Sequence, residues 1–141
     1  MDKLKITKTN FDEEEVSIDL FAETNEVRIE IDTFEFKCQI KAFAEKICDY
    51  ARDPKKECDA ELLHFRMKIA PMCKKGGVVF EMEIDISEFE IGYGEYFADK
   101  SQAEKTHKCS FYMLTDIQSI DDFGRRMKGI IDGDIGYEVT L

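Results

Sequence analysis

Residues 26–54 read EVRIEIDTFEFKCQIKAFAEKICDYARDP, and their apolar rhythm changes once along the stretch. The first part alternates apolar with charged residues, which predicts a half-buried strand through Val27, Ile29 and Ile31. The second part spaces its apolar residues by three or four, at Ile40, Phe43, Ile47 and Tyr50, and Pro54 follows as a stop signal. The stretch therefore predicts a strand that runs directly into an amphipathic helix.

A second stretch, SIDDFGRRMKGIID at residues 119–132, has the same helical design. We expect Ser119 to be its N-cap, with Asp121 and Asp122 in the first turn. Its apolar stripe consists of Ile120, Phe123, Met127 and Ile130. The strand-like run HKCSFYMLTDI precedes it, and its first three stripe residues match those of the first helix at an offset of 80. The match has two explanations: a strand-then-helix unit that occurs twice, or the general likeness of amphipathic helices that pack on a sheet.

Alternating patterns predict further strands, separated by turn signals such as Lys75-Gly76-Gly77. The residues expected to point inward are Val16, Ile18, Leu20, Leu63, Phe65, Met67, Ile69, Val78, Phe80, Met82, Ile84, Ile86, Tyr137, Val139 and Leu141. The phase slips near Ser87, where we expect a bulge. The sequence predicts an α+β fold in one domain, residues 1–141, with a mainly antiparallel sheet, two amphipathic helices and a strand-helix duplication.

The formal net charge of the 141 residues is −11, and residues 78–99 carry −7 of it. An acidic surface repels nucleic acid and anionic membranes, and it speeds association with basic partners. The N-terminal segment lacks the apolar core of a signal peptide, and no apolar run approaches the ~20 residues needed to cross a bilayer. We expect a cytoplasmic protein that binds neither nucleic acid nor membrane.

The five cysteines have wide spacings and include no Cys-x-x-Cys pair, which favours reduced thiols that act mostly as small core residues. His64 and His107 fall on polar faces and are expected to be solvated, and His107 with Cys109 does not have ordinary zinc spacing. No phosphate-binding loop or nucleophile motif is present in the sequence. We expect no catalytic residue, no metal and no cofactor.

The run VVFEMEIDISEFEIGYGEYFAD, residues 78–99, holds seven acidic residues and no Lys or Arg. Glu81, Glu83 and Asp85 are expected on one strand face, about 7 Å apart, and either a solvated sheet face or a binding surface explains them. Tyrosine side chains among carboxylates are well suited to bind surfaces rich in Arg and Lys. The residues predicted to bind a partner are Glu81, Glu83, Asp85, Glu88, Glu90, Tyr93, Glu95, Tyr96 and Asp99.

The two strand-to-helix junctions and the acidic strand between them resemble bacterial immunity proteins of the WapI type. The resemblance spans roughly residues 16–131 as a pattern, without a diagnostic motif. It implies a protein that binds and silences a polymorphic or contact-dependent toxin, and it transfers no functional residue. The runs DPKKECDAELL and GYGEYFADKSQAEKTHK have no counterpart in that family pattern.

The sequence thus favours an immunity protein that occludes a basic toxin domain, and a nuclease, whose active site must attract phosphate, is the expected toxin. A regulatory domain with an unrelated partner is the main alternative. A small hydrolase with an unrecognised carboxylate site is the third.

Overall fold

The structure is a computed structural model that describes residues 2–74, 77–89 and 105–141. Within these ranges the chain forms β1 (Lys3–Phe11), β2 (Glu15–Glu23), β3 (Arg28–Phe36), α1 (Lys37–Arg52), β4 (Cys58–Glu61), β5 (Phe65–Lys74), β6 (Gly77–Phe89), β7 (Lys105–Thr115), α2 (Ile117–Asp132) and β8 (Glu138–Thr140). All strand pairs are antiparallel. The predicted α+β class, with mainly antiparallel sheet and two helices, is confirmed.

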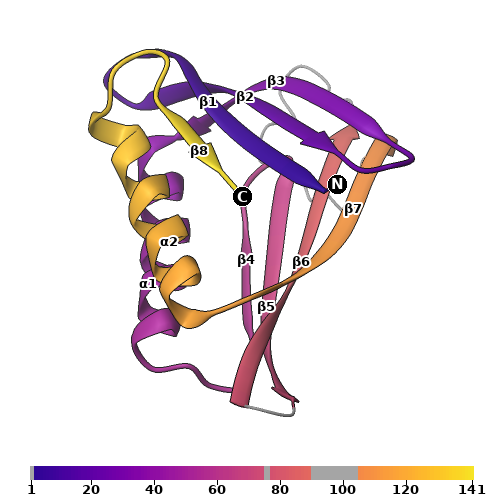
Figure 1. Cartoon of the computed structure of the whole chain (residues 1–141). Coiled ribbons are helices and arrows are strands. Elements are labelled where there is room, and N and C mark those ends of the chain that lie inside the picture. The colour runs from indigo at the N-terminus through magenta and orange to yellow at the C-terminus, as the bar shows by residue number, and fades with distance from the viewer. Residues whose placement is uncertain (1, 75–76, 90–104) are drawn as a thin grey trace.

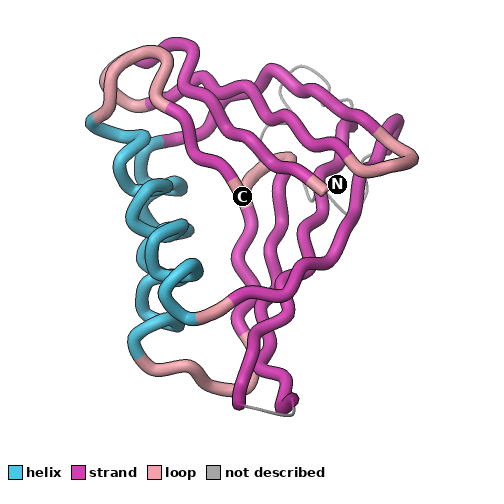
Figure 2. Tube along the Cα trace, in the orientation of Figure 1, coloured by secondary structure: helices cyan, strands magenta, loops and turns pink. Residues whose placement is uncertain are grey.

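The strands form two four-stranded sheets, in the orders β3-β2-β1-β8 and β4-β5-β6-β7. The sheets stand at a steep angle to each other, and α1 and α2 close the open side of this wedge (Figure 1). Both helices therefore lie on one side of all the strands (Figure 2). One hydrophobic core fills the space between, with buried side chains from both sheets and both helices.

The chain order repeats once, because β1-β2-β3-α1-β4 has the same plan as β5-β6-β7-α2-β8. Each half is a three-stranded meander, a helix of 16 residues and a short last strand. The short strands are exchanged: β4 pairs with β5 of the second half, and β8 pairs with β1 of the first. The expected strand-helix duplication is confirmed, and it includes more elements than the sequence predicted.

The apolar stripes of both helices are buried as predicted, and α1 adds Ala44 to its stripe while α2 adds Gly124. The predicted start of the second helix is wrong. The N-cap is Asp116, whose side chain accepts a hydrogen bond from the Ser119 amide at 2.8 Å. This cap satisfies an amide of the first turn, so α2 begins at Ile117 and Asp121 follows the first turn.

Strand ends account for three errors in the predicted core. Val27 is 41% exposed just before β3, and Val78 is 58% exposed near the β5–β6 turn. Leu63 is half-buried in the turn between β4 and β5, where Leu62 takes the core position instead. Alternation places side chains correctly only where the strand lies over the core.

Ser87 is buried beside Ile86, and the register with β7 shifts between Glu88 and Phe89. The irregularity that the phase slip predicted is therefore present, one residue further along. Two strands were not predicted at all. The strand β4 has four residues, which is too short for a clear pattern, and β1 places a lysine where an apolar residue is expected.

That residue, Lys8, is only 1% exposed and follows Leu4 and Ile6 on the inner face of β1. Its Nζ donates hydrogen bonds to the carbonyl oxygens of Ile130, Ile131 and Gly133, at 2.8, 3.2 and 2.6 Å. Helix ends leave their last carbonyls without partners inside the helix, and the helix dipole favours a cation there. Lys8 therefore caps the C-terminus of α2 from the neighbouring sheet.

Candidate functional site

The outer face of the β4-β5-β6-β7 sheet, turned away from the core, holds three of the predicted site residues. Glu81, Glu83 and Asp85 alternate along β6 with the buried Phe80, Met82 and Ile84. All three carboxylates are partly buried by their neighbours on the sheet. The predicted face of this strand is therefore confirmed, and its role in binding stays a prediction.

Cations on the adjacent strands offset part of this negative charge. Lys68 of β5 lies opposite Glu83, and Arg66 lies opposite Asp85. From β7, the Ser110 hydroxyl donates to Asp85, and Lys108 Nζ is 4.0 Å from its Oδ1 atom. The run lacks basic residues in sequence, but the fold brings them alongside two of its carboxylates. Asp85 therefore has more polar partners than the sequence suggested, and Glu83 has a cation opposite it on β5.

Glu81 has different neighbours, Ala70 on one side and Leu114 on the other. Leu114 is 50% exposed, and Tyr112, opposite Glu83, is 58% exposed. The negative charge of Glu83 raises the pKa of the Tyr112 hydroxyl, and Glu81 adds to the rise. Glu81, Glu83, Tyr112 and Leu114 thus form a mixed acidic and apolar surface, which we call the β6–β7 patch.

The remaining predicted site residues are not placed by the structure. Glu88 pairs with His107 in the β6–β7 ladder, but their side chains are not described. The last five lie outside the described residues and stay predictions: Glu90, Tyr93, Glu95, Tyr96 and Asp99.

Sequence reasoning missed Tyr112 and Leu114. The signal was present, because Cys109, Phe111 and Met113 in HKCSFYMLTDI alternate with them, which sends Tyr112 and Leu114 to the opposite face. Alternation therefore gives the face of both residues, but it does not show that this face lies beside the acidic strand.

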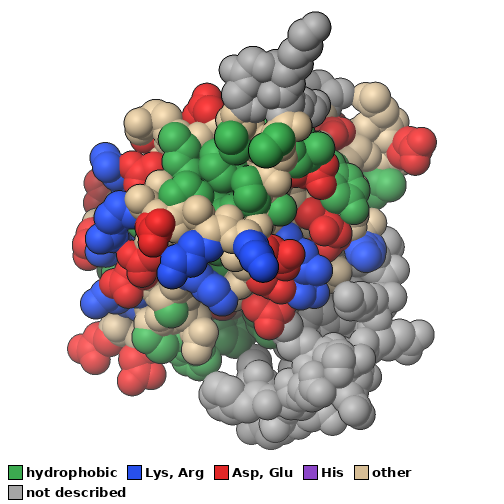
Figure 3. Space-filling view, turned by 90° about the horizontal axis from the view of Figure 1, so that it is seen from below, with side chains coloured by type: hydrophobic (Ala, Val, Ile, Leu, Met, Phe, Trp, Pro, Cys, Tyr) green, Lys and Arg blue, Asp and Glu red, His purple; other side chains and the backbone are tan. Residues whose placement is uncertain are grey.

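The view from below shows acidic and basic side chains intermixed in a band, next to a gathering of hydrophobic side chains (Figure 3). Charges of both signs alternate there, and they do not form one uniform acidic surface. The electrostatic attraction of a partner to this face therefore depends more on the local arrangement of charged side chains than on the net charge of the chain.

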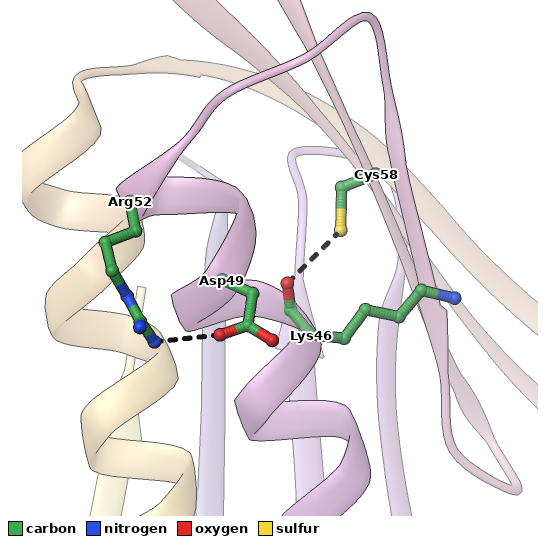
Figure 4. A network of polar contacts seen from close by, with 4 residues as sticks. All are labelled: Lys46, Asp49, Arg52 and Cys58. Atoms are coloured by element: carbon green, nitrogen blue, oxygen red, sulfur yellow. Dashed lines mark hydrogen bonds and ion pairs between the residues drawn. The ribbon is translucent and has the colours of Figure 1, made fainter.

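A groove of about 400 Å³ lies between α1 and the edge strand β4. Its lining residues are Gln39, Ala42, Phe43, Lys46, Asp59, Ala60, Glu61 and Arg66. The Lys46 side chain extends from α1 on the side away from the Asp49–Arg52 ion pair (Figure 4). The Cys58 thiol lies 4.0 Å from the Lys46 carbonyl oxygen. We term this the α1–β4 groove.

All five cysteines are free thiols. Cys58 and Cys109 are buried as expected of core residues, and burial raises the pKa of each. Cys38 and Cys73 are exposed, so the expected core role is wrong for them. No three His, Cys, Asp or Glu side chains among the described residues are placed to hold a metal ion.

His64 is half-buried, and its Nδ1 lies 2.8 Å from the Ser87 carbonyl oxygen. The sequence predicted a solvated histidine, and this was wrong because the β4–β5 turn folds against β6. The Ser87 amide completes the contact by donating to the His64 carbonyl oxygen at 3.1 Å. His64 therefore joins the turn to β6.

The outer face of the other sheet holds a second group of carboxylates. Asp19 lies directly opposite Asp32, and Glu30 is nearby on β3. The pKa of Asp19 is raised to about 6, mainly by burial and further by the charges of Glu30 and Asp32. The Oδ1 atom of Asp19 is buried without a hydrogen-bond partner among the described residues. Like charges directly opposite each other destabilise a sheet.

We expect Asp19→Asn to raise the free energy of unfolding at pH 7.5 by about 1 kcal/mol. The folded chain holds the Asp19 proton at pH values where the unfolded chain, with a pKa near 3.9, has released it. The contribution of this bound proton to the free energy of unfolding of the wild type is therefore lost as pH rises from about 4 to about 6. It stays lost at higher pH. Urea unfolding from pH 4 to 8 should show the variant's advantage growing across that window.

Glu23→Gln is the matched control, because Glu23 lies on the same face between Lys3 and Arg28. It should lack the advantage of Asp19→Asn. A constant difference between Asp19→Asn and wild type over the whole pH range would contradict the raised pKa.

None of the helices in the described ranges has the length and hydropathy needed to span a bilayer. Neither a protein-family model nor a curated protein sequence matches the chain. The fold defines an α+β protein of two strand-helix halves that exchange their short last strands.

Proposed function

We propose that the chain is a cytoplasmic immunity protein that binds a basic toxin domain in a stoichiometric complex and occludes it. The observation that carries the proposal is the β6–β7 patch, where Tyr112 and Leu114 are exposed beside Glu81 and Glu83. Aromatic side chains are enriched at the centre of protein interfaces, and polar groups surround that centre at the rim.

The partner is expected to be basic because Glu81 has no cation opposite it on either neighbouring strand. A Lys or Arg of the partner would supply that charge, and Tyr112 offers a ring face for a cation. The net charge of −11 adds a longer-range attraction that speeds association at low salt. A nuclease domain suits these features, since its active site must attract phosphate.

The test begins with tagged chain as bait in the native host, at low and at physiological salt. The captured domain is then expressed alone and together with the chain. We expect it to be toxic alone and harmless in a one-to-one complex. Growth unaffected by the captured domain alone would overturn the immunity function and leave only a regulatory complex.

The surface is tested with Tyr112→Ala and Leu114→Ala, each expected to weaken binding about tenfold or more, mainly through faster dissociation. Ile135→Ala is the matched control, because Ile135 is 60% exposed and lies in the α2–β8 loop. Glu81→Lys should slow association and reduce its salt dependence. Equal affinity of all variants, measured by calorimetry, would remove the β6–β7 patch from the interface.

A further inference from the structure

We propose that the α1–β4 groove is a second binding site, which takes an extended peptide segment of a partner protein as an added strand beside β4. The segment carries an apolar side chain for the floor of the groove and an acidic side chain, two residues away, for Lys46. This site is separate from the β6–β7 patch and does not depend on the proposed immunity function.

The edge of β4 has the backbone groups that such a strand needs. The sheet order ends at β4, and the Leu62 amide donates to the Phe65 carbonyl oxygen at 2.7 Å. In an antiparallel ladder hydrogen-bonded and non-hydrogen-bonded pairs alternate, so Ala60 bonds to Met67 while the N–H and C=O of Asp59 point away from β5. Among the described residues no strand pairs with this side of β4, so these two groups face an open edge of the sheet.

The opposite wall is one face of α1, where Gln39, Ala42 and Lys46 are exposed. A groove between a helix and a sheet edge is the geometry in which PDZ and PTB domains bind extended peptides. The backbone of such a peptide pairs with the edge strand, and alternate side chains enter the groove. The volume of about 400 Å³ suits a few residues.

The floor of the groove is apolar and well supported. Phe43 is 3% exposed and packs edge-on against Phe65 and Phe123, with ring centroids 5.6 and 6.4 Å apart. Ala60, also 3% exposed, is small and leaves depth beside the ring. A small or medium apolar side chain of the peptide fits this position.

Charge selects the second position. Arg66 forms a bidentate ion pair with Asp59, through Nε at 3.0 Å and Nη2 at 2.6 Å, so these two side chains neutralise each other. Lys46 makes no ion pair with a residue in the described part of the chain. With carboxylates also in the lining, the groove disfavours a multiply charged anion such as a nucleotide, whereas one peptide carboxylate pairs with Lys46.

The test is a selection from a display library of random decapeptides against the whole chain, followed by affinity measurements on the enriched peptides. We expect enriched peptides to share an apolar residue two positions from Asp or Glu. Lys46→Glu should weaken their binding about tenfold through like-charge contact, and Ala42→Glu should weaken it as well. Lys41→Glu is the matched control, since Lys41 is exposed on α1 outside the groove.

Amide hydrogen exchange then tests the added strand itself. The Asp59 amide should exchange more slowly in the complex than in the free chain, because the peptide accepts its hydrogen bond. A selection that yields no peptide would overturn the proposal. Peptides that bind Lys46→Glu as well as Lys41→Glu, or that leave Asp59 unprotected, would overturn it too.

Discussion

Replacement of Lys8 by methionine is expected to lower the free energy of unfolding by about 3–5 kcal/mol. The change removes three charge-assisted hydrogen bonds and leaves the carbonyl oxygens of Ile130, Ile131 and Gly133 without their donor. It also removes the cation that the helix dipole favours at the end of α2. Methionine has nearly the same length, so the loss reports the polar contacts more than a cavity. Urea unfolding monitored by circular dichroism measures it.

Lys5→Met is the control for this prediction, because Lys5 lies on the other face of β1, three residues earlier, and is half-exposed. Its effect should stay within about 0.5 kcal/mol. A loss below about 1 kcal/mol in Lys8→Met would show that water or other donors replace the ammonium, and that the cap is dispensable. Hydrogen exchange in the last turn of α2 should be faster in Lys8→Met if the contact holds the helix end.

Local apolar spacing was sufficient to predict both helices, because each helix buries one apolar stripe and the residues of that stripe recur every three or four positions in the sequence. Ile40, Phe43 and Ile47 are buried where the spacing puts them. The role of Lys8 could not be predicted in this way. Its partners are more than 120 residues away in sequence, and nothing near Lys8 indicates that a helix end will lie over it.

The candidate site shows the same division between local and long-range information. The outward direction of Glu81 and Glu83 follows from alternation alone. The balance of charge does not, because it depends on register: a shift of β5 by one residue would turn Lys68 away from Glu83. Tyr112 and Leu114 combine both cases, since alternation gives their face, but only the pairing of β7 with β6 places them beside the carboxylates.

The two helices pack against each other at the open side of the wedge between the sheets. Each helix leads into a short strand that pairs with the sheet of the other half, β4 with β5 and β8 with β1. Ala44 and Gly124 occupy matching positions, 80 residues apart, and both are buried. At Gly124 the absence of a side chain lets α2 approach Ile47 and Cys48 of α1, and this makes the contact between the helices sensitive to added volume.

Gly124→Ala is therefore expected to destabilise the chain by about 2 kcal/mol. The new Cβ would stand 2.7 Å from Cys48 Sγ, 3.1 Å from Ile47 Cγ2 and 3.3 Å from the Cys48 backbone nitrogen. The first distance is too short for any real contact, so the Cys48 side chain must turn aside or α2 must move away from α1. The close backbone nitrogen of Cys48 means that rotation of the side chain alone does not relieve all of the crowding. Alanine is favoured over glycine within a helix by about 1 kcal/mol. The expected loss of about 2 kcal/mol is the net result, after this gain has been subtracted from the cost of overpacking.

Cys48→Ala supplies the compensating change, because it removes the sulfur atom that the new methyl group meets first. The double variant should recover part of the stability lost in Gly124→Ala, although the contacts with Ile47 and the Cys48 backbone remain. A double-mutant cycle from urea unfolding gives the coupling, which we expect at about 1 kcal/mol. A Gly124→Ala variant more stable than wild type would mean that the gain in helix propensity exceeds the cost of overpacking, and that the space between α1 and α2 accommodates the methyl group.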